Sequence, residues 1–213
     1  MHHLTYNTIR YNLAYPKNFD PTRKYPLVIY VHGAGSRGHD PANIGFSYQL
    51  KNYAEDRGLQ ILVAAPLCEF DNWYMSFTEL VAFIRYAAAM DNVDSDRVYL
   101  MGASMGGYAT WALLMCVPEL IAAASPICGG GMAWNAARMR EVPIWAFHGV
   151  EDPVVAVTES ITMSNALRAC GGNVKLTLLN LPPESAHNAW DPALYDHRVV
   201  EWMLTHRLSE RGK

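Results

Sequence analysis

The chain of 213 residues carries a formal net charge of −3 at pH 7, with 51% hydrophobic and 17% charged residues. This composition is typical of a compact α/β domain with a large buried core, and it excludes a disordered or fibrous chain. The slightly acidic balance also argues against nucleic acid as a partner, because phosphate backbones are bound by basic stripes.

Short apolar, often β-branched runs alternate along the chain with longer helical stretches. An antiparallel edge strand is expected at residues 12–15, before Pro16. The further predicted strands are 26–31, 60–64, 97–101, 121–125, 144–147 and 174–179, and the predicted helices lie near 46–57, 76–91, 105–116, 157–170 and 192–207. This alternation predicts a single α/β domain over residues 1–213, with a mostly parallel central sheet flanked by helices on both faces.

A glycine-rich loop at residues 32–38 follows the first of the predicted parallel strands. Glycines let a backbone approach a ligand oxygen closely, so the amide of Ala34, or that of Gly35 as the alternative, is a candidate donor to an oxyanion. The loop lacks the motifs of a phosphate-binding loop and of a dinucleotide site. His32 precedes a glycine after a strand, as His148 does, and we expect both to bond to loop backbone.

A serine between two glycines, in Gly102-Ala103-Ser104-Met105-Gly106, connects the strand at 97–101 to the helix at 105–116. A strand that turns abruptly into a helix brings backbone against backbone, and these glycines remove the Cβ atoms that would collide. Such a turn exposes the Ser104 hydroxyl as a nucleophile. It also directs the amide of Met105, at the positive end of the helix dipole, toward a developing oxyanion.

A serine hydroxyl is a weak nucleophile at neutral pH, so it requires a base and a carboxylate that orients the base. His187 is the candidate base, because it lies in a loop of prolines and small residues after the last predicted strand. Asp152 is the preferred carboxylate, a few residues after the strand at 144–147, with Glu151 as the alternative. In an open parallel sheet such loops meet at one edge, so the three side chains are expected to converge there.

The cysteines and the N-terminal residues carry little functional signal. Cys68, Cys116, Cys128 and Cys170 are scattered without a Cys-x-x-Cys pair, which favours four free thiols and no metal site. No apolar run approaches the ~20 residues that cross a bilayer, and the first residues do not resemble a secretory signal. We therefore expect no membrane partner and, by default, a cytoplasmic protein, with secretion left open.

Four motifs together resemble those of α/β-hydrolase esterases, the group with dienelactone hydrolase-like, polyhydroxybutyrate depolymerase-like and feruloyl esterase-like members. They are His-Gly-Ala-Gly at 32–35, Gly-Ala-Ser-Met-Gly-Gly at 102–107, His-Gly-x-x-Asp at 148–152 and Ala-His-Asn-Ala-Trp at 186–190. Their order of nucleophile, acid and base is that of this fold. The resemblance implies an α/β-hydrolase fold without a large cap domain, a serine carboxylesterase and no cofactor. Ser104 stands where true dienelactone hydrolases have a cysteine, which argues against dienelactone cleavage.

The resemblance also implies that aromatic residues after residues 65–68 border the substrate pocket, which points to Trp73. Trp190, three residues after His187, is expected to wall the same pocket with Gly35, and Trp134 is a further candidate. Burial in the core is the alternative for these tryptophans, because it is their commoner place.

The expected substrates are short-chain or aromatic acyl esters, either small molecules or acyl groups on a plant polysaccharide. A serine peptidase of the prolyl-oligopeptidase type and a catalytically silent binding protein of the same fold are the alternatives. The chain shows no gating domain, which argues against the peptidase. The presence of all three triad residue types argues against the silent protein. The oligomeric state is not predicted.

Overall fold

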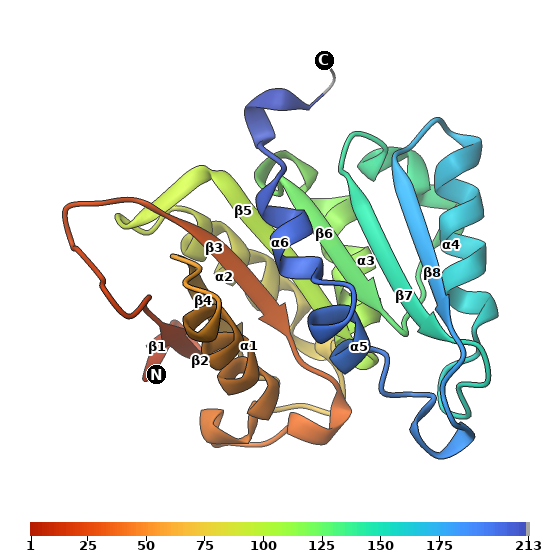
Figure 1. Cartoon of the computed structure of the whole chain (residues 1–213), viewed down its shortest axis with the longest axis horizontal. Coiled ribbons are helices and arrows are strands. Elements are labelled where there is room, and N and C mark those ends of the chain that lie inside the picture. The colour runs from red at the N-terminus through yellow and green to blue at the C-terminus, as the bar shows by residue number, and fades with distance from the viewer. Residues whose placement is uncertain (212–213) are drawn as a thin grey trace.

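The computed structural model describes residues 1–211, which fold around one eight-stranded sheet (Figure 1). The strand order is β1-β2-β4-β3-β5-β6-β7-β8. The strands are β1 His2–Tyr6, β2 Ile9–Ala14, β3 Tyr25–Val31, β4 Leu62–Pro66, β5 Val93–Ala103, β6 Ala123–Ile127, β7 Ile144–Gly149 and β8 Val174–Leu179. β1 and β2 pair antiparallel with each other, and β2 pairs antiparallel with β4. All pairs from β4 to β8 are parallel, so the predicted mostly parallel sheet is confirmed.

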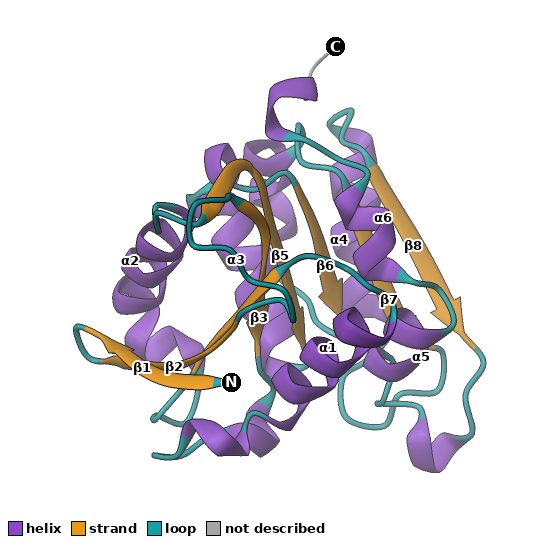
Figure 2. Ribbon diagram, turned by 60° about the vertical axis from the view of Figure 1, so that its left-hand side comes forward, coloured by secondary structure: helices purple, strands orange, loops and turns teal. Residues whose placement is uncertain are grey.

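Helices cover both faces of the sheet, as predicted (Figure 1, Figure 2). They are α1 Gly45–Asp56, α2 Phe77–Ala88, α3 Met105–Cys116, α4 Thr158–Ala169, α5 Trp190–Tyr195 and α6 Val199–Leu204. The core cluster on one face includes residues of α2, α3 and α4, and the cluster on the other face includes residues of α1, α5 and α6. No helix among the described residues is both long and apolar enough to cross a membrane.

Strand β3 shows why its sequence is apolar at every position. Leu27, Ile29 and Val31 pack into the cluster with α2 and α3, whereas Val28 and Tyr30 pack into the cluster with α1. Successive side chains of a strand point to opposite faces, and both faces of this sheet are covered. Tyr30 therefore faces α1, on the side of the sheet where a cavity opens at the strand ends.

Several predicted elements differ from the structure: among the strands, β4 begins two residues after the predicted start at 60, and β5 begins four residues before the predicted start at 97. The helix predicted at 192–207 is wrong, because α5 and α6 are separate helices and Arg198 between them adopts a left-handed φ of 54°. Strand β6 begins two residues after the predicted start at 121. The edge strand predicted at 12–15 is the antiparallel β2, but β1 pairs outside it and forms the edge. The side chains of β1 are mostly exposed, so no apolar pattern marked this strand.

Candidate active site

Ser104 lies at the tight turn between β5 and α3, with a φ of 57° and a ψ of −120°. A Cβ on Gly102 would collide with the carbonyl oxygen of Gly106, and a Cβ on Gly106 would collide with that of Val31. The Ser104 amide donates to the carbonyl of Ile127 at 2.9 Å, which ties the turn to β6. The glycine spacing and the packing of the neighbouring strands thus hold a non-glycine residue in a strained conformation, with its hydroxyl at the edge of the sheet.

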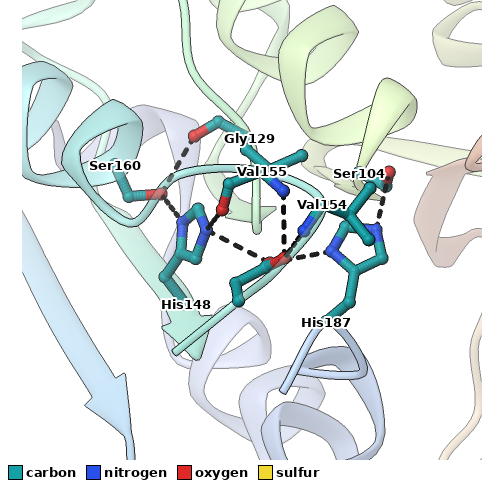
Figure 3. A network of polar contacts seen from close by, with 8 residues as sticks. Ser104, Gly129, His148, Val154, Val155, Ser160 and His187 are labelled. Atoms are coloured by element: carbon teal, nitrogen blue, oxygen red, sulfur yellow. Dashed lines mark hydrogen bonds and ion pairs between the residues drawn. The ribbon is translucent and has the colours of Figure 1, made fainter. Parts of the chain in front are cut away.

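The side chains of Ser104, His187 and Asp152 form one hydrogen-bonded chain (Figure 3). His187 Nε2 lies 2.9 Å from Ser104 Oγ, and His187 Nδ1 lies 2.7 Å from Asp152 Oδ2. The carboxylate accepts a hydrogen bond from Nδ1–H. The neutral ring therefore has no proton on Nε2, which is free to take the serine proton. The His187 loop packs against the end of β7, where a Cβ on Gly149 would collide with the carbonyl of Ala186. The histidine side chain is 21% exposed and accessible from the cavity.

The Asp152 carboxylate is buried and held on both oxygens. Oδ1 accepts the amides of Val154 and Val155 at 2.8 and 2.9 Å, and Oδ2 accepts from His187. Burial raises the pKa of Asp152, but the hydrogen bonds from His187 and the two amides outweigh it, so the pKa lies below its usual value. Asp152 is therefore ionised at neutral pH. Glu151, the alternative carboxylate, is exposed and belongs to no bond in this network.

A second histidine, His148, packs against the same carboxylate (Figure 3). Its Nε2 lies 2.9 Å from the Val155 carbonyl and 3.3 Å from Asp152 Oδ2, so Nε2 carries a proton. Its Nδ1 lies 2.7 Å from the Ser160 hydroxyl, which lies 2.9 Å from the carbonyl of Gly129. Burial lowers the pKa of His148. The bond to Val155 matches the expected contact with loop backbone, whereas only the structure reveals the contact with Asp152.

The glycine-rich loop after β3 lies directly beside the serine. A Cβ on Gly33 would lie 3.3 Å from the Cβ of Ser104, so the next residues, the short 3-10 helix Ala34–Ser36, begin next to the hydroxyl. Within the described residues, the amides of Ala34, Gly35 and Met105 donate to no carbonyl. These amides are therefore free to bind a ligand oxygen. Ala34 and Gly35 line the cavity at Ser104, whereas Met105 begins α3 and is not part of the lining.

His32 and Trp73 support this loop from inside the protein. The Cys68 amide donates to His32 Nε2 at 2.9 Å, so the ring proton is on Nδ1 and is donated to the Gly33 carbonyl at 2.7 Å. Trp73 Nε1 donates to the His32 carbonyl at 3.0 Å, and the indole ring packs against the His32 imidazole with ring centroids 5.0 Å apart. Trp73 is fully buried and does not line the cavity. The structure thus places Trp73 behind the loop and not in the substrate pocket, because a ring that fills the core also satisfies its N–H there.

A cavity of about 530 Å³ opens at Ser104 and His187. Its aromatic walls are Tyr30, Phe46 and Trp190, and the Trp190 ring stands perpendicular to the His187 ring at 5.6 Å. Trp190 and Gly35, both predicted to border a pocket, line this cavity. Trp134 is 82% exposed and does not line the cavity.

Sequence reasoning missed Tyr30 and Phe46 as lining residues. The alternation along β3 is the signal that would have placed Tyr30 on the face covered by α1, two residues before His32. Phe46 lies in the first turn of α1 and packs against Tyr30 at 4.7 Å, so it follows once Tyr30 is placed. Tyr30 was predicted only as part of the strand at 26–31 and Phe46 only as the start of the helix near 46–57, so the wall that they form with Trp190 was not predicted.

One mixed group of metal-binding residue types occurs among residues 1–211. Donor atoms of Cys128, Asp152 and His187 all lie within 4.8 Å of one another. Burial raises the pKa of the Cys128 thiol, and a metal binds only the thiolate. His187 and Asp152 are already bonded to each other at 2.7 Å. A protonated thiol beside a hydrogen-bonded histidine and carboxylate fits proton transfer from Ser104 to His187 better than it fits a metal centre.

Comparisons with known proteins bear on the family and the fold of the chain. A family model described as Phospholipase/Carboxylesterase matches residues 70–197. The chain is 28% identical over 174 residues to feruloyl esterase C of Emericella nidulans, covering 78% of this chain and 63% of that protein. It is 27% identical over 144 residues to the bifunctional acetylxylan esterase/xylanase XynS20E of Neocallimastix patriciarum, covering 66% of this chain and 21% of that protein. The chain thus spans less than two thirds of the length of either relative.

Two solved structures show the same arrangement of elements. A thermostable esterase matches with a TM-score of 0.84 and 32% identity, over 97% of this chain and 63% of that one. Est1E from Butyrivibrio proteoclasticus matches with a TM-score of 0.70 and 18% identity, over 96% of this chain and 97% of that one. The second likeness bears on the fold alone. Together with the sheet order, these matches confirm the α/β-hydrolase fold.

Proposed function

The chain belongs to the phospholipase/carboxylesterase family of α/β-hydrolases, and from this membership we propose that it hydrolyses carboxylic esters through Ser104, His187 and Asp152. The observation that carries the proposal is the chain of bonds from Ser104 Oγ to His187 Nε2, at 2.9 Å, and from Nδ1 to Asp152 Oδ2, at 2.7 Å. A general base works within hydrogen-bond reach of the proton that it takes, and both distances meet this requirement.

The reaction begins when Ser104 Oγ attacks the ester carbonyl carbon and His187 Nε2 takes the hydroxyl proton. Ionised Asp152 keeps the other ring proton on Nδ1 and stabilises the imidazolium. The imidazolium then gives its proton to the leaving alcohol oxygen, and the acyl group stays on Ser104. In the second half, His187 takes a proton from water while the water oxygen attacks the acyl carbon, and Ser104 leaves with the proton returned to it.

The oxyanion of both tetrahedral intermediates is stabilised by the amides of Ala34 and Met105, with Gly35 as the alternative to Ala34. Support comes from their lack of other acceptors and from the closeness of the Gly33 loop to Ser104. Met105 also begins α3, whose dipole places partial positive charge at this end. Loss of one such donor typically costs ~10²–10³ in turnover.

The cavity supports acyl groups that are short or aromatic. Its volume of about 530 Å³ is ordinary for a small-molecule site, and Phe46 and Trp190 offer flat apolar walls. The names of two relatives, a feruloyl esterase and an acetylxylan esterase, point to acyl groups on a plant polysaccharide. We therefore propose a small-molecule ester, or an aromatic or acetyl ester on such a polymer, as the substrate.

Replacement of Ser104 by alanine tests the proposal. The wild type should hydrolyse p-nitrophenyl acetate or butyrate, methyl ferulate or acetylated xylan, and Ser104→Ala should lower kcat by at least ~10³-fold. Ser95→Ala is the matched control, because Ser95 is exposed on the same strand, nine positions before Ser104, and should leave activity unchanged. Unchanged turnover in the Ser104 variant would contradict the assignment of the nucleophile.

A fluorophosphonate probe and a peptidase panel separate the alternatives. The probe should label the wild type at Ser104 and fail to label Ser104→Ala. A wild type that stays unlabelled would indicate a catalytically silent protein. Cleavage of dipeptidyl arylamides without cleavage of aryl esters would instead indicate a serine peptidase on the same fold.

A further inference from the structure

Tyr30 is a buried tyrosine whose hydroxyl has no hydrogen-bond partner among the described residues. The side chain is 4% exposed and lines the cavity at Ser104. Every other buried tyrosine has a partner for its hydroxyl: Tyr11 contacts Tyr86, Tyr25 contacts Asp20, Tyr53 contacts Glu201 and Tyr99 contacts the carbonyl of His206. Buried polar groups are almost always paired, so the Tyr30 hydroxyl bonds either to water or to a ligand in the cavity.

The Tyr30 hydroxyl opens on the cavity and remains a donor. Unlike the unpartnered Trp111 Nε1 and Ser164 Oγ, it is not sealed away from solvent in the core. Burial, with smaller contributions from Cys128 and Asp191, raises the pKa of Tyr30. The phenol therefore keeps its proton at neutral pH and presents it to whatever oxygen enters the cavity.

The depth of Tyr30 defines which part of a ligand it can contact. Tyr30 pairs with Met101 of the parallel strand β5, and Ser104 follows the last residue of β5, three positions after Met101. At ~3.3 Å per residue, the two positions are about 10 Å apart along the strands. Because Tyr30 and Ser104 line the same cavity from these two backbone positions, a ligand whose carbonyl lies at Ser104 meets Tyr30 with the part that extends away from the carbonyl.

The walls between these two positions favour a flat group. Phe46 packs against Tyr30 with ring centroids 4.7 Å apart, and Trp190 stands against His187. All these residues line the same cavity. An aromatic acyl chain that passes Trp190 and Phe46 brings its ring substituent toward Tyr30.

We propose that Tyr30 is a specificity-determining residue that donates a hydrogen bond to a ring hydroxyl at the far end of an aromatic acyl group. The inference rests on the proposed function and adds to it the favoured acyl class and the residue that recognises it. A hydroxyl, unlike a hydrogen or a methyl group, supplies the acceptor that Tyr30 lacks. A site built to bond a substrate hydroxyl discriminates against analogues without one, because its own polar group is then left unpaired.

Tyr30→Phe removes only the hydroxyl and is the direct test. The wild type should prefer methyl p-coumarate over methyl cinnamate and over methyl p-methylcinnamate, which has similar size but no polar substituent. In Tyr30→Phe the ratio of kcat/KM for p-coumarate to that for cinnamate should fall about 10-fold, because only p-coumarate loses a hydrogen bond. Tyr53→Phe is the matched control, because its hydroxyl bonds to Glu201 outside the cavity, and it should keep the wild-type ratio.

An unchanged ratio in Tyr30→Phe would overturn the inference. If that variant fails to fold, a wild type that does not distinguish p-coumarate from p-methylcinnamate overturns it equally, and a clear preference for p-coumarate supports it. This second comparison needs only the wild-type protein and two esters that differ at one ring position.

Binding to the Ser104→Ala protein separates this inference from the proposed function. Calorimetry should show p-coumaric acid binding more tightly than cinnamic acid, with the difference lost in Ser104→Ala/Tyr30→Phe. Selective binding by a protein whose wild type hydrolyses no ester would contradict the proposed function and retain the role of Tyr30. Equal binding of both acids, or binding of neither, would overturn the role of Tyr30 whatever the wild type hydrolyses.

Discussion

His32 makes the stability of this fold sensitive to acid, and replacing it with glutamine should remove that sensitivity. The imidazole accepts from the Cys68 amide and donates to the Gly33 carbonyl, so it is held as the neutral Nδ1–H form. The side chain is fully buried, and burial lowers its pKa from 6.5 to about 4. A proton added on Nε2 would remove the acceptor of the Cys68 amide, beneath the loop that carries Ala34.

The direction and the size of the pH dependence of stability follow from this lowered pKa. The folded protein keeps His32 neutral at pH values where the unfolded chain has already protonated it. The stabilisation is complete above pH 6.5, declines as the pH falls toward about 4 and is absent below that value. A shift from 6.5 to about 4, at ~1.4 kcal/mol per pKa unit, corresponds to on the order of 3 kcal/mol in the free energy of unfolding.

Urea unfolding followed by tryptophan fluorescence at about pH 7.5 and about pH 4 measures this difference. Glutamine offers the Cys68 amide a carbonyl oxygen and does not titrate. Between the two pH values, the free energy of unfolding should fall by on the order of 3 kcal/mol more in the wild type than in His32→Gln. The other titratable groups contribute equally to both proteins. Equal losses in the two proteins would refute the reasoning.

The remaining predictions concern the carboxylate of the proposed triad. Asp152→Asn should lower kcat by about 10³–10⁴-fold, because an amide no longer holds the His187 tautomer, and an unchanged kcat measured with an aryl ester would contradict this. His148→Leu removes a donor 3.3 Å from Asp152 Oδ2 and should lower kcat about 10-fold, whereas His148→Gln should restore part of it. In the Asp152→Asn background, His148→Leu should cost little further kcat, and a full additive loss would indicate that His148 acts only on the fold.

Local sequence motifs were sufficient to predict many residues of the candidate site. The glycines around Ser104 permit a turn in which a Cβ would collide with neighbouring backbone, and the glycines of the loop at 32–38 indicate where a backbone approaches closely. The chain order of serine, aspartate and histidine then placed each side chain after a different strand of a parallel sheet. Because such strands all end at one edge, their convergence follows from the strand pattern alone.

Trp73 shows where the sequence pattern was insufficient. Its position after β4 suggested a pocket wall, yet its indole bonds to the His32 carbonyl from within the core. A tryptophan suits a pocket and a core equally well by composition, and only the packing around it decides between them. The sequence analysis also missed the division of the last predicted helix. Arg198, with its left-handed φ of 54°, separates α5 from α6 there.

By itself, the sequence determined most of the strand and helix pattern, the turn at Ser104 and the chain order of the proposed triad, because these depend on local sterics and on the period of apolar residues. Only the tertiary structure decided that His148 packs on Asp152, that Trp73 supports the loop of Ala34 and that Tyr30 opens on the cavity. The contact of His148 with Asp152 spans four residues but depends on how the loop after β7 folds back, and the contact of Trp73 with His32 joins residues 41 positions apart. The distances between these side chains depend on how the helices and loops pack against the sheet, and this packing cannot be predicted from a local sequence pattern.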